Sequence, residues 1–152
     1  MSNSSQAQAL VDRYPYMFQQ PEMLNFYAGW LDPLETLCAR IHARLRGSAM
    51  TFQFLQIKEK FGVCRIYFHL GLPRSEPETA IRIEELATLR QSIQDDVEIA
   101  ESDCGSRCMV CGEDAATRSH GAVLATLCQR HALSESMRDP WTLAKAPITS
   151  GA

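Results

Sequence analysis

Two pairs of metal-binding residues in the last third of the chain constrain its fold more than any other feature. Two residues separate Cys108 from Cys111, and two residues also separate Cys128 from His131 further along the chain. Zinc binds four nitrogen or sulfur ligands in a tetrahedron, and this spacing lets a tight turn, or the first turn of a helix, direct two ligands to one point. The sequence therefore predicts a zinc site built from three cysteines and one histidine.

All four of these ligands come from the protein, so no coordination position remains for water or substrate, and we expect the Zn²⁺ to be structural. Between the two pairs, residues 115–118 and 123–127 have the pattern of two strands about a turn at residues 119–121. Residues 133–138 can continue as a helix after the second pair. A Cys-x2-Cys-Gly turn, a hairpin and a helix in this order are typical of a treble-clef zinc finger.

Other interpretations of the neighbouring side chains stay open. Cys108 and Cys111 could form a redox pair, but such pairs lie where a strand meets a helix in a βαβ unit, which this chain lacks. Cys104 precedes Cys108 at a Cys-x3-Cys spacing and is either a spare thiol or an alternative ligand. We expect His120 to be a solvent-exposed residue of the hairpin turn.

The overall composition limits the class of protein. The 152 residues allow one compact domain, or one domain with a small appendage, and 45% hydrophobic residues are enough for a core. No apolar leader and no long apolar run occurs, which predicts a cytoplasmic protein without a membrane partner. In that reducing compartment, clustered cysteines favour metal binding over disulfides.

The region before the cysteines predicts an α+β domain. Residues 33–46 have the apolar stripe of a helix, with Asp32 as the expected N-cap and Gly47 ending it. Residues 51–57 and 63–70 read as two strands of an antiparallel hairpin, in which Cys64 belongs to the buried face.

A long helix is expected over residues 77–101, starting from a capping box of Ser75 and Glu78 and packing across the hairpin. Residues 14–30 read as irregular or short-helical core packing, whereas residues 1–9 are small and polar and are expected to fray.

These elements divide the chain into three parts. An α+β core domain is expected over residues 10–103, the zinc finger over residues 104–138, and a flexible tail over residues 139–152. The predicted fold class is therefore α+β, an antiparallel hairpin or small sheet packed with helices, plus a C-terminal treble-clef-like finger.

The charge pattern is uneven along the chain. Residues 74–103 contain nine acidic residues and three arginines, a local charge of −6, and acids near a helix C-terminus oppose its dipole. Such an acidic helix can capture a basic partner through four residues: Asp95, Asp96, Glu98 and Glu101. A solvated helix face, or intramolecular pairing with the basic residues between positions 40 and 65, explains the same pattern.

Signatures of catalysis and of nucleic-acid binding are weak. The chain has no Gly-x-Ser-x-Gly, no phosphate-binding glycine loop and no His-Glu-x-x-His motif, so we expect a protein that is not an enzyme. The net charge of −3 provides no basic field for a polyphosphate chain, and the finger with its metal is close to neutral. Only a local basic patch could support nucleic-acid binding.

Several short motifs resemble a group of small bacterial and phage proteins. Residues 56–62 (QIKEKFG) followed by residues 65–67, and the later Cys108-x2-Cys111-Gly112 with Leu-Cys-x2-His, are similar to that group's hairpin and C-terminal finger. Residues 29–30 and 33–34 resemble its N-terminal region. Val63-Cys64 and Ala122 depart from the group's pattern without touching a ligand. The resemblance implies a zinc-stabilised domain, and some such proteins are immunity proteins of polymorphic toxins.

The predicted function is that of a non-catalytic binding protein, namely an immunity protein that neutralises a bacterial toxin by binding it directly. The acidic helix and the adjoining finger are the expected contact surface. The alternatives are a nucleic-acid-associated or phage regulatory protein that uses the zinc finger, and a subunit of a larger enzyme.

Overall fold

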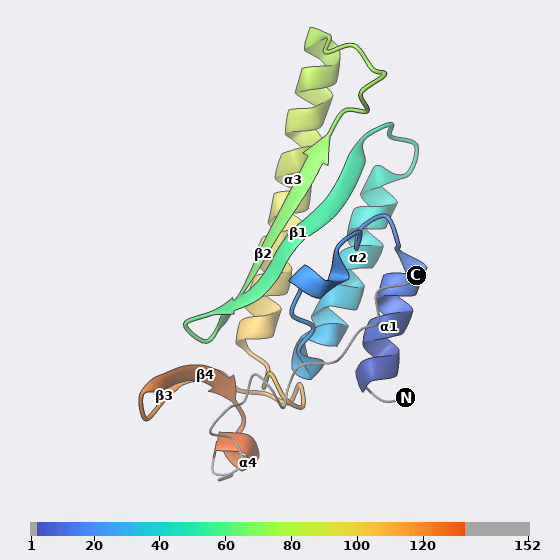
Figure 1. The fold of residues 1–152 in the computed structure, drawn as a ribbon. Coiled ribbons are helices and arrows are strands. Elements are labelled where there is room, and N and C mark those ends of the chain that lie inside the picture. Colours follow the sequence, from blue (N-terminus) through green and yellow to red (C-terminus); the bar gives the residue numbers. More distant parts are fainter. Residues whose placement is uncertain (1–2, 133–152) are drawn as a thin grey trace.

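The computed structural model describes residues 3–132 and confirms an α+β fold. Two antiparallel two-stranded sheets and four α-helices make up this part of the chain (Figure 1). The helices are α1 (Asn3–Arg13), α2 (Leu31–Leu45), α3 (Ala80–Gly105) and α4 (Gln129–Ala132). The strands are β1 (Thr51–Lys60), β2 (Val63–Gly71), β3 (Ala116–His120) and β4 (Val123–Leu127). Two 3-10 turns, η1 (Pro21–Met23) and η2 (Ala28–Trp30), lie between α1 and α2.

The predicted hairpin is present, with strands longer than expected. β1 pairs with β2 from Thr51↔Gly71 to Lys60↔Val63, with a bulge between Phe54 and Gln56. Only Phe61 and Gly62 connect the strands, and their φ angles are 52° and 84°. A two-residue turn with two positive φ angles matches the right-handed twist of the strands, so the pairing extends to the tip.

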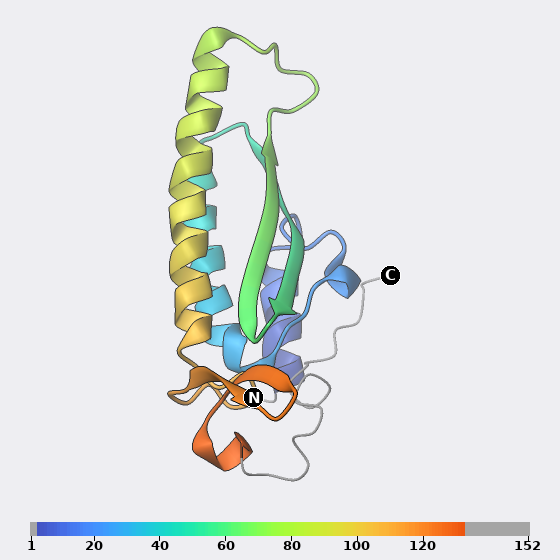
Figure 2. The same cartoon turned by 90° about the vertical axis from the view of Figure 1, so that its left-hand side faces the viewer.

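The main core lies between the inner face of this hairpin and the helices α2 and α3, which lie on one side of it (Figure 2). Cys64 and Ile66 alternate with exposed residues along β2, as the sequence predicted. From α3, Ile93 and Val97 fill the space behind the strands and are fully buried. The packing of Ile93 and Val97 behind Cys64 and Ile66 shows that the middle of α3 lies across β2.

The irregular segment before α2 covers the free edge of β1. The backbone N–H of Asn25 donates to the carbonyl of Ile57 at 2.8 Å, and that of Phe54 donates to the carbonyl of Met17 at 2.8 Å. A bridge between Leu24 and Ile57 runs parallel to the strand. The prediction of short-helical core packing for residues 14–30 is thus confirmed, and the segment also completes the hydrogen bonding of an edge strand.

The N-terminal prediction was wrong. The structure has the helix α1 where residues 1–9 were expected to fray, and Ala7 and Leu10 are buried against the core. Ala7, Leu10, Val11 and Tyr14 recur every three to four residues, which is the spacing of one helix face. The serines and glutamines between them hid this stripe. The predicted tail, residues 139–152, lies outside the described residues.

Both predicted helix starts were also wrong. α2 begins directly after η2, with Trp30 at its N-cap and no side-chain cap, and Asp32 instead accepts a hydrogen bond from Gln6 at 2.9 Å. α3 begins after Thr79, whose hydroxyl accepts the N–H of Arg82 at 3.2 Å, rather than near Ser75. In both cases the helix starts at a position set by the end of the preceding segment, and the capping pattern read from the sequence does not mark that position.

Two side chains of α3 protect the outer edge of β2. Glu101 accepts the backbone N–H of Ile66 at 3.0 Å, and Arg90 donates to the carbonyl of Leu70 at 2.8 Å. An edge strand exposes unpaired polar groups that invite pairing with another chain. The helix therefore contributes polar contacts to the hairpin as well as apolar packing.

We predict that Glu101→Ala lowers the free energy of unfolding by about 1–3 kcal/mol, because it leaves the N–H of Ile66 without its acceptor. Glu98→Ala, on the exposed side of the same helix, is the matched control and should change stability by less than about 0.5 kcal/mol. Urea unfolding of the two variants measures the difference. Equal effects would mean that the Glu101 contact contributes no stability.

Candidate metal centre

The first ligand pair lies on a tight turn after α3. The N–H of Gly112 donates to the carbonyl of Cys108 at 2.8 Å, and the N–H of Cys108 donates to the carbonyl of Glu113 at 2.7 Å. Gly112 has a φ of 79°, a value that favours glycine, and it lets the chain reverse immediately after Cys111. The turn therefore brings both thiols to the same side.

The second pair is delivered by the hairpin of β3 and β4. The strands pair in register from Ala116↔Leu127 to His120↔Val123. Cys128 follows β4 directly, and the N–H of Ala132 donates to its carbonyl at 2.9 Å, which forms the first turn of α4 and places His131 beside Cys128. The order of turn, hairpin and helix agrees with the predicted finger. The predicted helix over residues 133–138, on which the treble-clef assignment depends, lies outside the described residues.

The four predicted ligands converge. The Sγ atoms of Cys108, Cys111 and Cys128 and a ring nitrogen of His131 all lie within 4.8 Å of one another. His131 presents Nδ1, which lies 3.4 Å from the Cys108 sulfur and 3.2 Å from the Cys128 sulfur, and the sulfurs of Cys111 and Cys128 are 3.7 Å apart. Tetrahedral ligands around zinc lie about 3.8 Å (sulfur to sulfur) and about 3.5 Å (sulfur to nitrogen) apart. The cluster is therefore shaped to hold a metal ion.

The local electrostatics favour a thiolate at Cys128. Burial opposes its ionisation, but hydrogen bonds from the backbone of His131 and Arg130 and from the other thiols outweigh burial and lower its pKa. Metal ions bind cysteine as the thiolate, so a lowered thiol pKa favours ligation at neutral pH. Arg130 also interacts with Cys111, and this interaction raises the pKa of the guanidinium.

Cys104 is not part of the cluster. It is buried at the end of α3, where its thiol interacts with that of Cys64. The hydrogen bond with Cys104, together with burial, raises the pKa of Cys64, so Cys64 is a neutral core thiol. Of the two interpretations of Cys104, a spare thiol fits the structure better than an alternative ligand.

Gly29 connects the metal-binding turn to the main core. Its N–H donates to the carbonyl of Met109 at 2.9 Å, and a Cβ atom on Gly29 would lie 1.8 Å from the carbonyl oxygen of Cys108. No other residue fits there without moving the backbone of the turn. This role of Gly29 is not visible in the sequence alone, because the glycine has an ordinary φ and its partner lies far along the chain.

A second connection runs through Thr126 on β4. Its hydroxyl donates to the carbonyl of Gly62 at 2.8 Å, and because it has only one proton, it must accept from Thr117 across the 2.7 Å contact. The backbone carbonyl of Thr126 also accepts from Met109 at 3.0 Å. Residues 106–132, hereafter the metal-binding unit, are thus joined both to η2 and to the tip of the first hairpin (Figure 1).

The four acidic residues proposed to bind a partner do not form one surface. Asp96 is only 5% exposed and makes a two-pronged contact with Arg44, as the alternative of intramolecular pairing predicted. Glu101 is held by the edge of β2. Asp95 and Glu98 alone remain exposed, each accepting from a glutamine one turn earlier. The prediction for Asp96 and Glu101 is therefore corrected.

The expectation for His120 was also wrong. The side chain is half-buried at the end of β3, and its Nε2 has no hydrogen-bond partner among residues 3–132. His120 is not a member of the metal cluster, which consists of Cys108, Cys111, Cys128 and His131.

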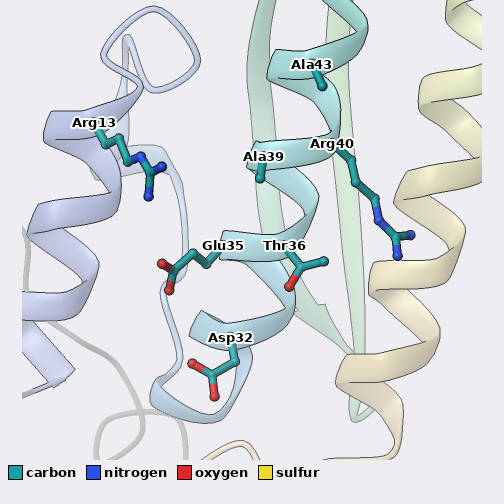
Figure 3. Close-up of a pocket in the computed structure, with 7 residues that line it drawn as sticks. All are labelled: Arg13, Asp32, Glu35, Thr36, Ala39, Arg40 and Ala43. Carbon is teal, nitrogen blue, oxygen red and sulfur yellow. The ribbon is translucent and has the colours of Figure 1, made fainter.

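An open groove of about 600 Å³ runs between α1 and α2 (Figure 3). Its charged side chains are Arg13, Asp32, Glu35 and Arg40. Figure 3 shows Arg13 and Glu35 reaching toward each other from the two helices, whereas Arg40 points toward α3. No cysteine, histidine or serine is among the residues that line this groove.

Comparisons of the chain with protein-family models, with curated proteins and with solved structures found no match. The helices of residues 3–132 include none that is both long and apolar enough to cross a membrane.

We predict that the purified protein holds one metal ion per chain and that Cys108→Ser loses most of it, because three donors bind far more weakly than four. Cys104→Ala is the control, since this buried thiol lies outside the cluster, and it should keep its metal. Elemental analysis of both variants and the parent measures the metal content. A metal-free parent protein would show that the cluster is not a metal site.

We also predict that Gly29→Ala lowers the free energy of unfolding by about 3 kcal/mol, because the added methyl group displaces the turn at Cys108. Gly105→Ala places the same methyl group where nothing lies within 4 Å and should not destabilise the protein. Chemical unfolding of the metal-loaded proteins tests the difference. Equal stabilities would contradict the close approach at Gly29.

Proposed function

We propose that the protein is a zinc-stabilised, non-catalytic binding protein, and that it neutralises a bacterial toxin by binding it directly, as an immunity protein. Zinc is the metal proposed because three thiols and one imidazole, at nearly tetrahedral separations, are the donor set and geometry that zinc prefers in structural sites. With four protein ligands, the ion would hold residues 108–131 together and perform no chemistry.

The exposed face of α3 is the observation that carries the proposal for binding. Asp95, Ile99 and Asp103 follow one another at four-residue spacing, with Glu98 and Ser102 beside them, so all five lie on one side of the helix. Ile99 is 46% exposed among these acids. The opposite side, including Val97 and Ala100, is buried in the core. An apolar residue surrounded by acids resembles the centre and rim of a protein interface.

This face suits the capture of a basic partner. Exposed charges of one sign accelerate the encounter with a partner of opposite sign, whereas a central apolar contact slows dissociation. The buried side of α3 fixes the backbone, so the face needs no rearrangement on binding. The resemblance of the chain's motifs to immunity proteins is the reason to propose a toxin as the partner.

We predict that Asp95→Lys with Glu98→Lys weakens binding to the product of the neighbouring gene about tenfold or more, since two acids become repulsive to a basic partner. Binding of the parent should also weaken between about 50 mM and about 300 mM salt. Glu84→Lys with Glu85→Lys makes the same charge change on the exposed first turns of α3 and is the matched control. Calorimetric titration measures all three proteins.

Two outcomes would contradict the proposal. Binding that survives the change at Asp95 and Glu98 would remove α3 from the interface. A neighbouring gene product that binds but is equally harmful to cells with and without this protein would remove the neutralising role. Because both pairs of substitutions lie at exposed positions, unfolding experiments should show that the variants remain folded.

A further inference from the structure

The outer face of the β1–β2 hairpin is basic. Lys58 pairs with Arg65 across the strands, and Lys60 pairs with Val63 next to the turn, so the three cations share the face turned away from the core. None of them forms an ion pair with another residue in the described range 3–132. Their charges are therefore available to an outside partner, although the chain as a whole carries a net charge of −3.

No acid neutralises this face from within the hairpin. Glu59 is the one acidic residue of the two strands, and its pairing with the buried Cys64 places it on the inner face. There its carboxylate accepts the backbone N–H of Gly62. The outer face thus presents cations together with an exposed tyrosine, Tyr67, over which the ammonium group of Lys58 lies 5.4 Å from the ring centre.

The tip of the hairpin carries an exposed aromatic ring at a backbone cost. Phe61 has a φ of 52°, a left-handed value that is rare for a bulky side chain and that glycine or asparagine adopts more readily. Phe61 is 72% exposed, so burial of the residue does not offset this cost. A strained residue whose ring is displayed to solvent points to a role outside the folded chain.

We propose that this surface, defined as Lys58, Lys60, Phe61, Arg65 and Tyr67, binds single-stranded nucleic acid. Surfaces that bind single strands combine cations that contact the phosphates with aromatic rings on which bases stack. Both features are present here, within ten residues of one hairpin. An acidic protein would also be attracted to the cations, but charge attraction alone does not explain why an aromatic ring is displayed at the strained position of Phe61.

The tip is held rigidly enough to present that ring. The carbonyl of Gly62, the residue after Phe61, accepts the hydroxyl of the buried Thr126, and a Cβ on Gly62 would lie 2.7 Å from the Thr117 side chain. The metal-binding unit therefore fixes the turn from below (Figure 1). The proposed site is separate from the acidic face of α3 and does not depend on the function proposed for that face.

Fluorescence anisotropy with a labelled oligothymidine of about twenty nucleotides tests the electrostatic part of the proposal. Three cations that each displace a counterion should give a slope of log affinity against log salt of about −2 for a single strand. The triple variant Lys58→Ala, Lys60→Ala, Arg65→Ala should lose binding and nearly all of this slope. Asp95→Lys with Glu98→Lys, on α3, should not reduce binding.

Phe61→Gly separates binding from folding. Glycine adopts the positive φ without strain, so the melting temperature should stay the same or rise, whereas affinity for the oligothymidine should fall about tenfold because one stacking ring is lost. An abasic strand of the same length should bind the parent more weakly and should not distinguish the parent from Phe61→Gly. Ile81→Ala removes another exposed apolar side chain, from the start of α3, and should leave binding unchanged.

Three results would overturn the proposal. The first is an absence of binding to the oligothymidine at low salt. The second is that the parent binds the abasic strand as tightly as the oligothymidine, or that Phe61→Gly does not change the affinity. Either outcome would mean that the surface attracts the strand by charge alone, without base stacking. The third is displacement of the strand by polyglutamate of equal charge at equal concentration, which would assign the surface to an acidic protein.

Discussion

The convergence of Cys108, Cys111, Cys128 and His131 is the constraint on which the rest of the structure depends. The metal-binding unit is much shorter than the roughly 40 residues below which a chain usually needs a metal or disulfides to fold. Its buried apolar side chains besides the cysteines are only Met109, Ala125 and Leu127, and they belong to the same core cluster as those of the main domain. The zinc ion that we propose for this site would contribute an apparent binding energy of roughly 10–16 kcal/mol, which is enough to hold such a unit in one conformation. When the unit is held in this conformation, the backbone of Cys108 packs closely against Gly29, and the backbone of β4 packs closely against Gly62.

The net charge of the chain hides two surfaces of opposite sign. Along α3, Asp96 and Glu101 are used within the fold, while Asp95 and Glu98 face solvent. On the hairpin, the cations lie on the outer face and Glu59 on the inner one. The helix packs on the inner face, so its own outer side and the outer side of the hairpin point in different directions (Figure 2). A single average charge therefore says little about which partner each surface can meet.

The sequence predicts well those features whose cause is local. Alternating apolar residues predicted the hairpin, a two-residue spacing predicted both ligand pairs, and Gly47 ends α2 with a positive φ as expected. It fails where the cause lies far along the chain. Asp96 could not be separated from its exposed neighbours without knowing that Arg44 lies opposite, and Gly29 could not be assigned without Cys108. The start of α2 was misplaced because η2 leads into the helix and makes a side-chain cap unnecessary.

The metal centre and the hairpin tip are linked by a short chain of contacts. Cys128 is only two residues from Thr126, so a metal ion that fixes Cys128 also fixes the end of β4. Thr126 then holds the carbonyl of Gly62, and the turn cannot relax into a conformation that would relieve the backbone of Phe61. Strain at one residue persists only where its surroundings determine the conformation more strongly than the residue does. A metal ion bound by the four clustered side chains would in this way also set the position of an exposed aromatic ring.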